Sequence, residues 1–227
     1  MIKFTPIAAL LAASLNFGAA QAQEVYGKLG VLGAGVGYAH GLSPSVTLRA
    51  DFSTIGSIGH DGNSGDFDYE AKIRNNVGTA YVDYFPFEGN FRVTAGLGLR
   101  DTRATAHGRP NIAGFVDIGD AVDIPLGPDD RADAEVEFPS VAPYLGLGWG
   151  HNAGRAAEPG WSFFADVGLY IGRPKTSFSV SDSVRASLTA AGYDADAEIQ
   201  KQRDEIHDEA KKFAVFPSVY VGVAYRF

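Results

Sequence analysis

The chain has 227 residues and a formal net charge of −8, and it contains no cysteine. This length suits one domain of moderate size or a barrel. The lack of cysteine excludes a disulfide scaffold and a thiolate metal site, and the acidic balance argues against a nucleic-acid partner. Glycine, with 28 residues, exceeds its usual share of about 7%. Because glycine weakens ordinary helices and strands, we expect a crowded backbone or a narrow interior.

Residues 1–22 have the pattern of a secretory signal peptide. Lys3 supplies a positive charge, residues 7–15 form a short apolar stretch, and Ala20-Gln21-Ala22 provides a small-residue cleavage site. The apolar stretch is too short to cross a bilayer as a helix, which takes about 20 apolar residues. We therefore expect the mature chain to begin at Gln23 and residues 23–227 to form one barrel domain.

The mature sequence alternates with period two, which is typical of β-strands whose two faces meet different surroundings. At the C-terminal end, one face carries Val219, Val221, Val223, Tyr225 and Phe227, and the other carries Ser218, Tyr220, Gly222, Ala224 and Arg226. Glycine and alanine opposite an apolar face suit a narrow barrel interior better than a water-facing surface. The pattern predicts eight strands, near residues 24–31, 33–41, 45–56, 68–85, 91–105, 134–150, 161–178 and 213–227.

Strands of about ten residues with one apolar face are what a transmembrane β-barrel requires, and aromatic residues near their ends favour the membrane–water boundary. Connections are predicted to be short at 41–44, 86–90 and 151–160, and long at 57–65, 106–131 and 173–211. We therefore expect an all-β fold, an eight-stranded antiparallel up-and-down transmembrane barrel. An even strand count places both termini in the periplasm and the long loops outside the cell.

Residues 194–212 are charged and lack strand alternation. Ile199, Ile206 and Phe213 recur every seven residues and predict one narrow apolar stripe on a helix. We expect one extracellular loop helix that covers the barrel mouth. The alternative is a movable lid or a partner-binding element.

The faces expected to point inward carry both charge signs and several tyrosines. They include Lys28, Arg49, Asp51, Tyr81, Asp83, Arg92, Arg100, Tyr144, Asp166, Tyr170, Tyr220 and Arg226. Eight strands enclose a space that side chains can fill, and buried charges must be paired. Two interpretations stay open: an ion-pair network with tyrosines that plugs the lumen, or a polar conduit that selects solutes through its charges. The inward glycines make room either for bulky neighbours or for water.

Other patterns predict no catalytic, cofactor or metal site. Ser57, His60 and Asp61 supply the residue types of a lipid-modifying hydrolase, but they lie within five residues of one another, where three side chains rarely converge on one atom. The stretch 61–68 is acidic, but it lacks the glycine and the glutamate of an EF-hand at the required positions.

Several motifs resemble a known family. They are the run Ala142-Pro143-Tyr144-Leu145-Gly146-Leu147-Gly148-Trp149-Gly150, then Gly160-Trp161, Asp166-Val167-Gly168-Leu169-Tyr170, Gly172-Arg173-Pro174-Lys175 and Phe216-Pro217-Ser218-Val219, and the final Tyr225-Arg226-Phe227. Together they resemble the small barrels related to the carbapenem-associated outer membrane protein of Gram-negative bacteria. The likeness is specific from about residue 140 to the end and weaker before it. It implies an eight-stranded barrel, proposed in that family as a channel for basic amino acids such as ornithine, with carbapenem entry as a side effect.

The chain also ends on an aromatic pattern, with Tyr225 two residues before the terminal Phe227. This pattern resembles the signal read by the outer-membrane assembly machinery. We therefore expect a monomer of the cell outer membrane that contacts its lipids and that machinery. The expected function is a narrow passive channel for small polar solutes such as basic amino acids. The alternative is a non-conducting structural or surface-interaction barrel that acts through its extracellular loops.

Overall fold

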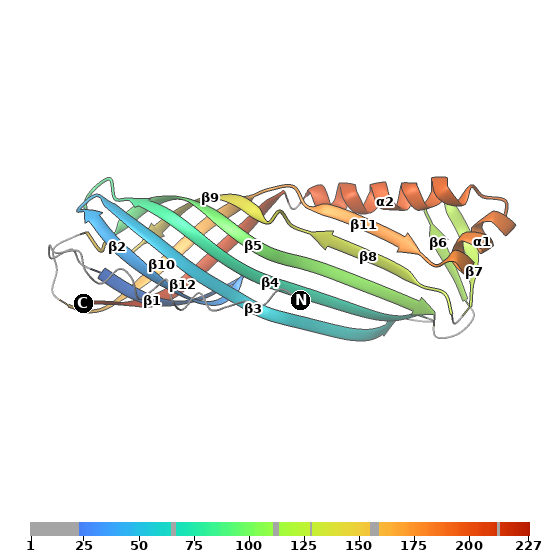
Figure 1. Ribbon diagram of the computed structural model, residues 1–227, viewed down its shortest axis with the longest axis horizontal. Helices are drawn as coiled ribbons and strands as arrows, with labels where there is room; N and C mark the ends of the chain where they lie inside the picture. Colours follow the sequence, from blue (N-terminus) through green and yellow to red (C-terminus); the bar gives the residue numbers. More distant parts are fainter. Residues whose placement is uncertain (1–22, 65–66, 111–113, 128, 155–158, 213) are drawn as a thin grey trace, which may run out of the picture.

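The computed structural model describes residues 23–64, 67–110, 114–127, 129–154, 159–212 and 214–227, so the predicted signal peptide lies outside the described residues. Eight antiparallel strands close into a barrel (Figure 1). They are β1 (Gln23–Gly30), β2 (Gly33–Ser43), β3 (Val46–Ser64), β4 (Phe67–Tyr84), β5 (Phe91–Pro110), β9 (Val141–Trp149), β10 (Gly160–Ile171) and β12 (Val215–Arg226). Pairing of β12 with β1 and of β5 with β9 completes the ring. The predicted eight-stranded barrel is confirmed.

The two ends of the barrel differ. The first and last described residues meet at one of them, where the Phe227 amide donates to the Gln23 carbonyl at 3.1 Å. We call this the terminal end, and the opposite one the extension end. Short turns join the strands at the terminal end, as the sequence predicts for residues 41–44 and 86–90.

At the extension end three strands continue far beyond the barrel. β3, β4 and β5 have 19, 18 and 20 residues, whereas about 9–11 suffice to cross a membrane. Their outer parts pair with β8 (Ala132–Glu137) and β11 (Lys175–Val180) in the order β11-β8-β5-β4-β3. We call this five-stranded sheet and the elements packed on it the extension. The prediction of loops at 57–65 and 106–131 was wrong. Residues 57–64 and 106–110 continue as paired strands, and most of 114–126 forms a further hairpin.

Two strands predicted as continuous are interrupted. The predicted strand 134–150 breaks at 138–140 into β8 and β9, although both halves still pair with β5. The predicted strand 161–178 breaks at 172–174, after which β11 leaves β12 and pairs with β8. Both breaks contain a proline, Pro139 and Pro174, which cannot donate to a sheet ladder.

A hairpin and two helices pack on the extension. They are β6 (Gly114–Ile118), β7 (Ala121–Leu126), α1 (Asp182–Ala190) and α2 (Ala195–Lys211). The predicted helix 194–212 is confirmed as α2, but it runs along β11 of the extension (Figure 1) and does not cover the barrel mouth as predicted. Asp194 caps it by accepting from the amides of Asp196 and Ala197 at 3.1 and 3.2 Å. The sequence analysis missed α1. Neither helix is long and apolar enough to cross a membrane.

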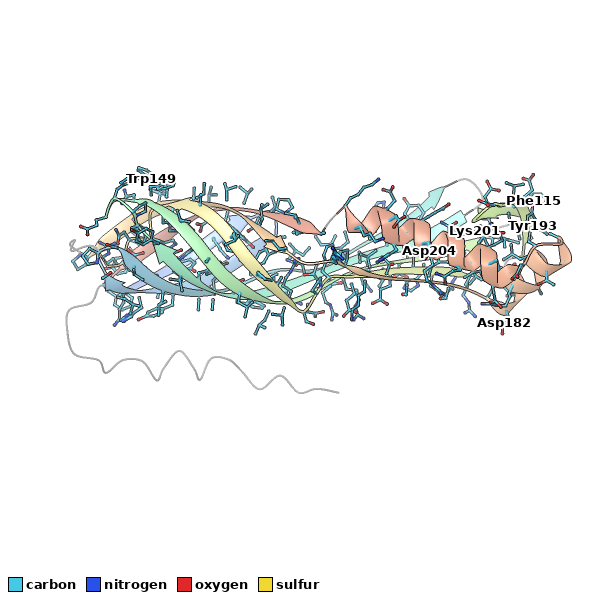
Figure 2. The ribbon with its side chains drawn as sticks, turned by 90° about the horizontal axis from the view of Figure 1, so that it is seen from above. Phe115, Trp149, Asp182, Tyr193, Lys201 and Asp204 are labelled. Atoms are coloured by element: carbon cyan, nitrogen blue, oxygen red, sulfur yellow. The ribbon has the colours of Figure 1, made fainter. Side chains whose placement is uncertain are left out.

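The extension has an ordinary apolar core. It comprises Ile118, Ala121, Ile124, Leu126, Val184, Leu188, Ala195 and Ile199, contributed by the hairpin and both helices. Of the predicted helix stripe, Ile199 is buried in this core, whereas Phe213 lies outside the described residues. Figure 2 shows Asp182, Phe115 and Tyr193 at the far tip of the molecule, with Trp149 at the opposite, barrel end.

The outer face of the barrel is apolar and exposed. Large apolar side chains cover it on every strand, among them Val36, Leu48, Val82, Leu97, Leu147, Phe163, Val167 and Val221. A continuous exposed apolar belt of this kind does not occur on ordinary soluble monomers. It is the surface that a barrel presents to hydrocarbon.

Candidate functional site

The twelve residues expected to point inward come from seven of the eight barrel strands. Eleven are buried: Lys28, Arg49, Asp51, Tyr81, Asp83, Arg92, Arg100, Tyr144, Asp166, Tyr170 and Tyr220. Arg226 is half-buried at the terminal end. Strand alternation brings them together, because every second residue of each strand faces the same narrow space.

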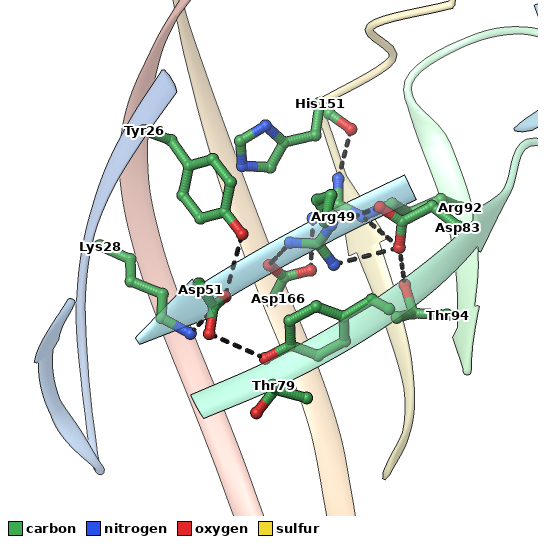
Figure 3. A network of polar contacts seen from close by, with 12 residues as sticks. Tyr26, Lys28, Arg49, Asp51, Thr79, Asp83, Arg92, Thr94, His151 and Asp166 are labelled. Atoms are coloured by element: carbon green, nitrogen blue, oxygen red, sulfur yellow. Dashed lines mark hydrogen bonds and ion pairs between the residues drawn. The ribbon is translucent and has the colours of Figure 1, made fainter. Parts of the chain in front are cut away.

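A layer of ion pairs crosses the middle of the barrel (Figure 3). The Arg49 guanidinium binds both carboxylate oxygens of Asp83, with Nη2–Oδ1 at 3.1 Å, and its Nη1 lies 3.2 Å from Asp166. Arg92 bonds to Asp166 and lies 3.6 Å from Asp83. Thr94 donates to Asp83 at 2.6 Å. Asp83 and Arg92 are both 0% exposed, so these charges have one another in place of water.

Asp51 extends the layer towards β1. It accepts an ion pair from Lys28 at 2.7 Å and hydroxyl bonds from Tyr26 at 3.0 Å and Tyr81 at 3.3 Å. Three bases, Lys28, Arg49 and Arg92, thus face three acids, Asp51, Asp83 and Asp166. The charges of this layer balance, which is the condition for burying them at tolerable free energy.

A layer of tyrosines lies against the ion pairs on the side of the extension. The ring centroids of Tyr81 and Tyr144 are 5.1 Å apart, and those of Tyr144 and Tyr170 are 4.9 Å apart. The Tyr170 hydroxyl is 2.7 Å from the Thr79 hydroxyl, and Tyr220 donates to Ser53 at 2.8 Å. These bonds span the barrel interior and hold the rings across it.

A third cluster lies at the terminal end, and the sequence analysis missed most of it. Glu24 accepts from Arg226 Nε at 3.0 Å and contacts His151 Nδ1 at 2.9 Å. The rings of Tyr26 and Phe164 pack against it. The signal was present for Glu24 and Tyr26, which alternate in phase with Lys28 on the same strand, whereas His151 was assigned only to a turn.

Neighbouring side chains occupy the space beside the inward glycines. A Cβ atom on Gly168 would lie 2.2 Å from the Tyr144 hydroxyl, and one on Gly148 would lie 2.4 Å from Asp166. Gly96, Gly98, Gly146 and Gly222 each likewise lie against an aromatic ring or hydroxyl. Of the two readings that the sequence left open, these contacts favour room for bulky neighbours over room for water.

The residues considered for hydrolysis do not converge. Ser57, His60 and Asp61 lie on β3 rather than in a loop, and alternation turns His60 to the face opposite the other two. Within the described residues, no group of three or more histidine, aspartate or glutamate side chains is placed to hold a metal ion.

Two acidic side chains of the extension, Asp130 and Glu198, are buried. Glu198 accepts from the Asp120 amide at 2.7 Å and pairs with Lys201 at 2.9 Å, which fastens α2 to the β6–β7 turn. The bond from Lys201 lowers the pKa of Glu198 below its ordinary value. The bonds to Asp120 and Glu198 raise the pKa of Lys201 to about 12.

A closed antiparallel barrel, apolar outside and filled with paired charges inside, defines the class of transmembrane β-barrels. No protein-family model and no curated protein matches the chain. Two solved structures from Acinetobacter baumannii share the fold. CarO2 gives a TM-score of 0.57 at 17% identity, over 91% of this chain and 98% of its own. CarO gives 0.52 at 18% identity, over 90% and 97%. The resemblance to the carbapenem-associated barrels is thus confirmed for the fold.

Proposed function

We propose that the protein is a Gram-negative outer-membrane protein of the CarO family whose sealed barrel anchors the extension at the cell surface. The apolar belt supports the membrane location, because only a closed barrel or a helix satisfies its backbone in hydrocarbon. The extension then lies outside the cell and the chain termini lie in the periplasm. We place residues 1–22 in a signal peptide that is removed on export.

The balanced layer of buried charges is the observation that best supports a sealed barrel. Arg49, Arg92 and Asp83 lie at the centre of the barrel with 4% or less of their surface exposed, and the tyrosine layer lies next to them. A conducting path would need each of these side chains to give up its partner. Breaking a buried pair costs about 3–5 kcal/mol, so the open state is rare.

The test is solute uptake by liposomes that contain the folded protein. We expect no swelling in ornithine, arginine or lysine beyond that of empty liposomes, with insertion verified by heat-modifiable migration. Saturable swelling in a basic amino acid would overturn the seal. It would instead support the competing function, a narrow passive channel for small polar solutes.

The second part of the proposal concerns the extension. Deleting residues 181–212 and joining the flanking strands by a glycine-serine linker removes both helices and leaves the eight barrel strands intact. We expect the truncated protein to reach the membrane but to lose the surface interaction, read as cell adhesion or envelope integrity. Unchanged adhesion and integrity would count against a role of the extension.

The C-terminal residues are proposed as the contact with the assembly machinery. Phe227 is half exposed and Tyr225 packs against Trp161, with ring centroids 5.1 Å apart, both at the terminal end. Deleting Phe227 is expected to lower the yield of heat-modifiable protein in the membrane. Phe87→Ala removes an exposed aromatic side chain from the 86–90 turn at the same end and leaves the C-terminal residues intact, so it serves as the control.

A further inference from the structure

Among the residues that the structure describes, one inward-facing charge has no partner. The three bases and three acids of the central layer balance, and Glu24 pairs with Arg226 at the terminal end. Arg100 lies beyond the tyrosine layer, on β5 at the extension end, and is 7% exposed. Within the described part of the chain its guanidinium makes no ion pair and donates no hydrogen bond. A buried charge without a counterion is costly, so this position calls for an anion.

Aromatic rings surround the Arg100 guanidinium. Its Cζ lies 5.1 Å from the ring centroids of Tyr170 and Phe216 and 5.4 Å from that of Phe138. Ring faces attract a cation, with a gain of about 0.5–2 kcal/mol. They do not accept the in-plane N–H groups, and Nε and Nη2 are both buried without an acceptor in the described ranges of the chain. Each such donor costs about 1–3 kcal/mol.

The two unpartnered nitrogens form one edge of the guanidinium. The same edge of Arg49, deeper in the barrel, holds both oxygens of the Asp83 carboxylate through Nε and Nη2. This bidentate arrangement is the geometry that a guanidinium offers to a carboxylate. Arg100 therefore presents, near the opening of the barrel, the edge that elsewhere in this protein binds a carboxylate.

One wall of this aromatic surround, the Phe138 ring, is held less tightly than Tyr170. Tyr170 is held by Thr79 at 2.7 Å and by Tyr81 at 3.4 Å. Phe138 is half-buried, lies in the break between β8 and β9, and contacts Phe216 edge-on with centroids 5.4 Å apart. A rotation of the Phe138 ring needs no strand pairing to break.

We propose that Arg100 binds the carboxylate of a small monoanionic organic acid at the extension end of the barrel, and that the Phe138 ring turns aside to admit it. The site goes beyond the proposed anchoring function. It needs access only from outside the cell, so it operates in a sealed barrel.

The test is an NMR titration of the folded protein in detergent micelles, with nitrogen-15 in its arginines. The Arg100 Nε–H resonance is identified by its absence from the R100K variant. We expect it to shift saturably with acetate and not with chloride at equal ionic strength. In the F138A variant the acetate affinity is expected to rise at least threefold, because the covering ring is gone.

Arg103 provides the matched control. It lies three residues further along the same strand, faces outward, and pairs with Glu135 at 2.9 Å and Glu137 at 3.3 Å. The R103Q variant is expected to bind acetate at Arg100 as the natural chain does. Absence of a saturable shift in both the natural chain and F138A would overturn the proposal, as would an equal shift with chloride. Because binding is read without transport, a conducting barrel would leave this result unaffected.

Discussion

The barrel and the extension share β3, β4 and β5, but polar side chains fill the barrel whereas apolar side chains form the core of the extension. In the barrel, β3, β4 and β5 place charges such as Asp83 inside and valines and leucines outside. In the extension, the apolar core of the hairpin and helices is inside, and the arginines of the same strands, including Arg74 and Arg103, are exposed.

The surrounding medium explains the inversion. An apolar side chain gains nothing by leaving hydrocarbon, so the barrel interior is held by polar contacts and close packing. In water, burial of apolar area drives folding, at about 25 cal/mol per Å². The two regions should therefore respond to different substitutions.

The largest effect is expected in the central charge layer. Asp83→Ala leaves Arg49 and Arg92 buried with Asp166 as their remaining acid, and should lower the free energy of unfolding by about 3–5 kcal/mol. Urea-induced unfolding in detergent, followed by circular dichroism, measures this. Asp101→Ala removes an exposed acid 3.8 Å from Arg74 and should cost at most about 1 kcal/mol. Equal losses for the two variants would contradict the buried network.

A cavity in the core of the extension should destabilise the extension and leave the barrel unchanged. Leu188→Ala empties a fully buried position on α1, at an expected cost of about 2–5 kcal/mol. Hydrogen exchange should speed up in α1, α2 and the β6–β7 hairpin and stay unchanged in the barrel strands. Val122→Ala, an exposed site on the same hairpin, is the control. Faster exchange throughout the barrel would show that the two regions unfold as one unit.

Adding a methyl group to a strand glycine should destabilise the barrel only where that glycine faces the interior. A Cβ atom on Gly222 would lie 2.2 Å from the Gly27 carbonyl oxygen and 2.4 Å from the Phe164 ring, whereas one on Gly27 would meet nothing within 4 Å. Gly222→Ala should cost about 1–3 kcal/mol, and Gly27→Ala should leave stability nearly unchanged. Thermal unfolding of the two variants compares them directly. Similar melting temperatures would mean that the interior has spare room.

The smallest effect is expected from the ion pairs that fasten α2. The pKa of Glu198 is lowered on folding, so its stabilisation is present above the ordinary value of 4.5 and is lost as the pH falls through the lowered pKa. Lys201 contributes below its ordinary 10.5 and loses its contribution as the pH rises through about 12. Protease cleavage in α2 and in the β6–β7 hairpin should therefore increase in acid, with a weaker pH dependence in Glu198→Gln. An identical dependence in that variant would assign the effect to other carboxylates.

Much of the barrel could be predicted because alternation is a local property. Each strand crosses between lipid and a polar interior, so residues such as Val221 and Gly222 alternate in the sequence itself. The helix at 194–212 was predictable for the same reason, since the apolar residues Ile199 and Ile206 recur along one stripe of a charged stretch without strand alternation. The extension was not, because its exposed strands alternate weakly and short strands such as β8 are stabilised only by their partners on β5 and β11.

The sequence by itself determined which residues point inward and that a barrel forms, because period two and side-chain polarity depend only on chain order. Only the tertiary structure decided which charges meet. Asp166 lies 117 positions from Arg49, and the closure of the ring brings them within 3.2 Å. The same closure fills the space beside each inward glycine, so the sealed interior is a property of the packed barrel. It also leaves Arg100 as the one inward charge without a partner among the described residues, which no count of acids and bases along the chain could reveal.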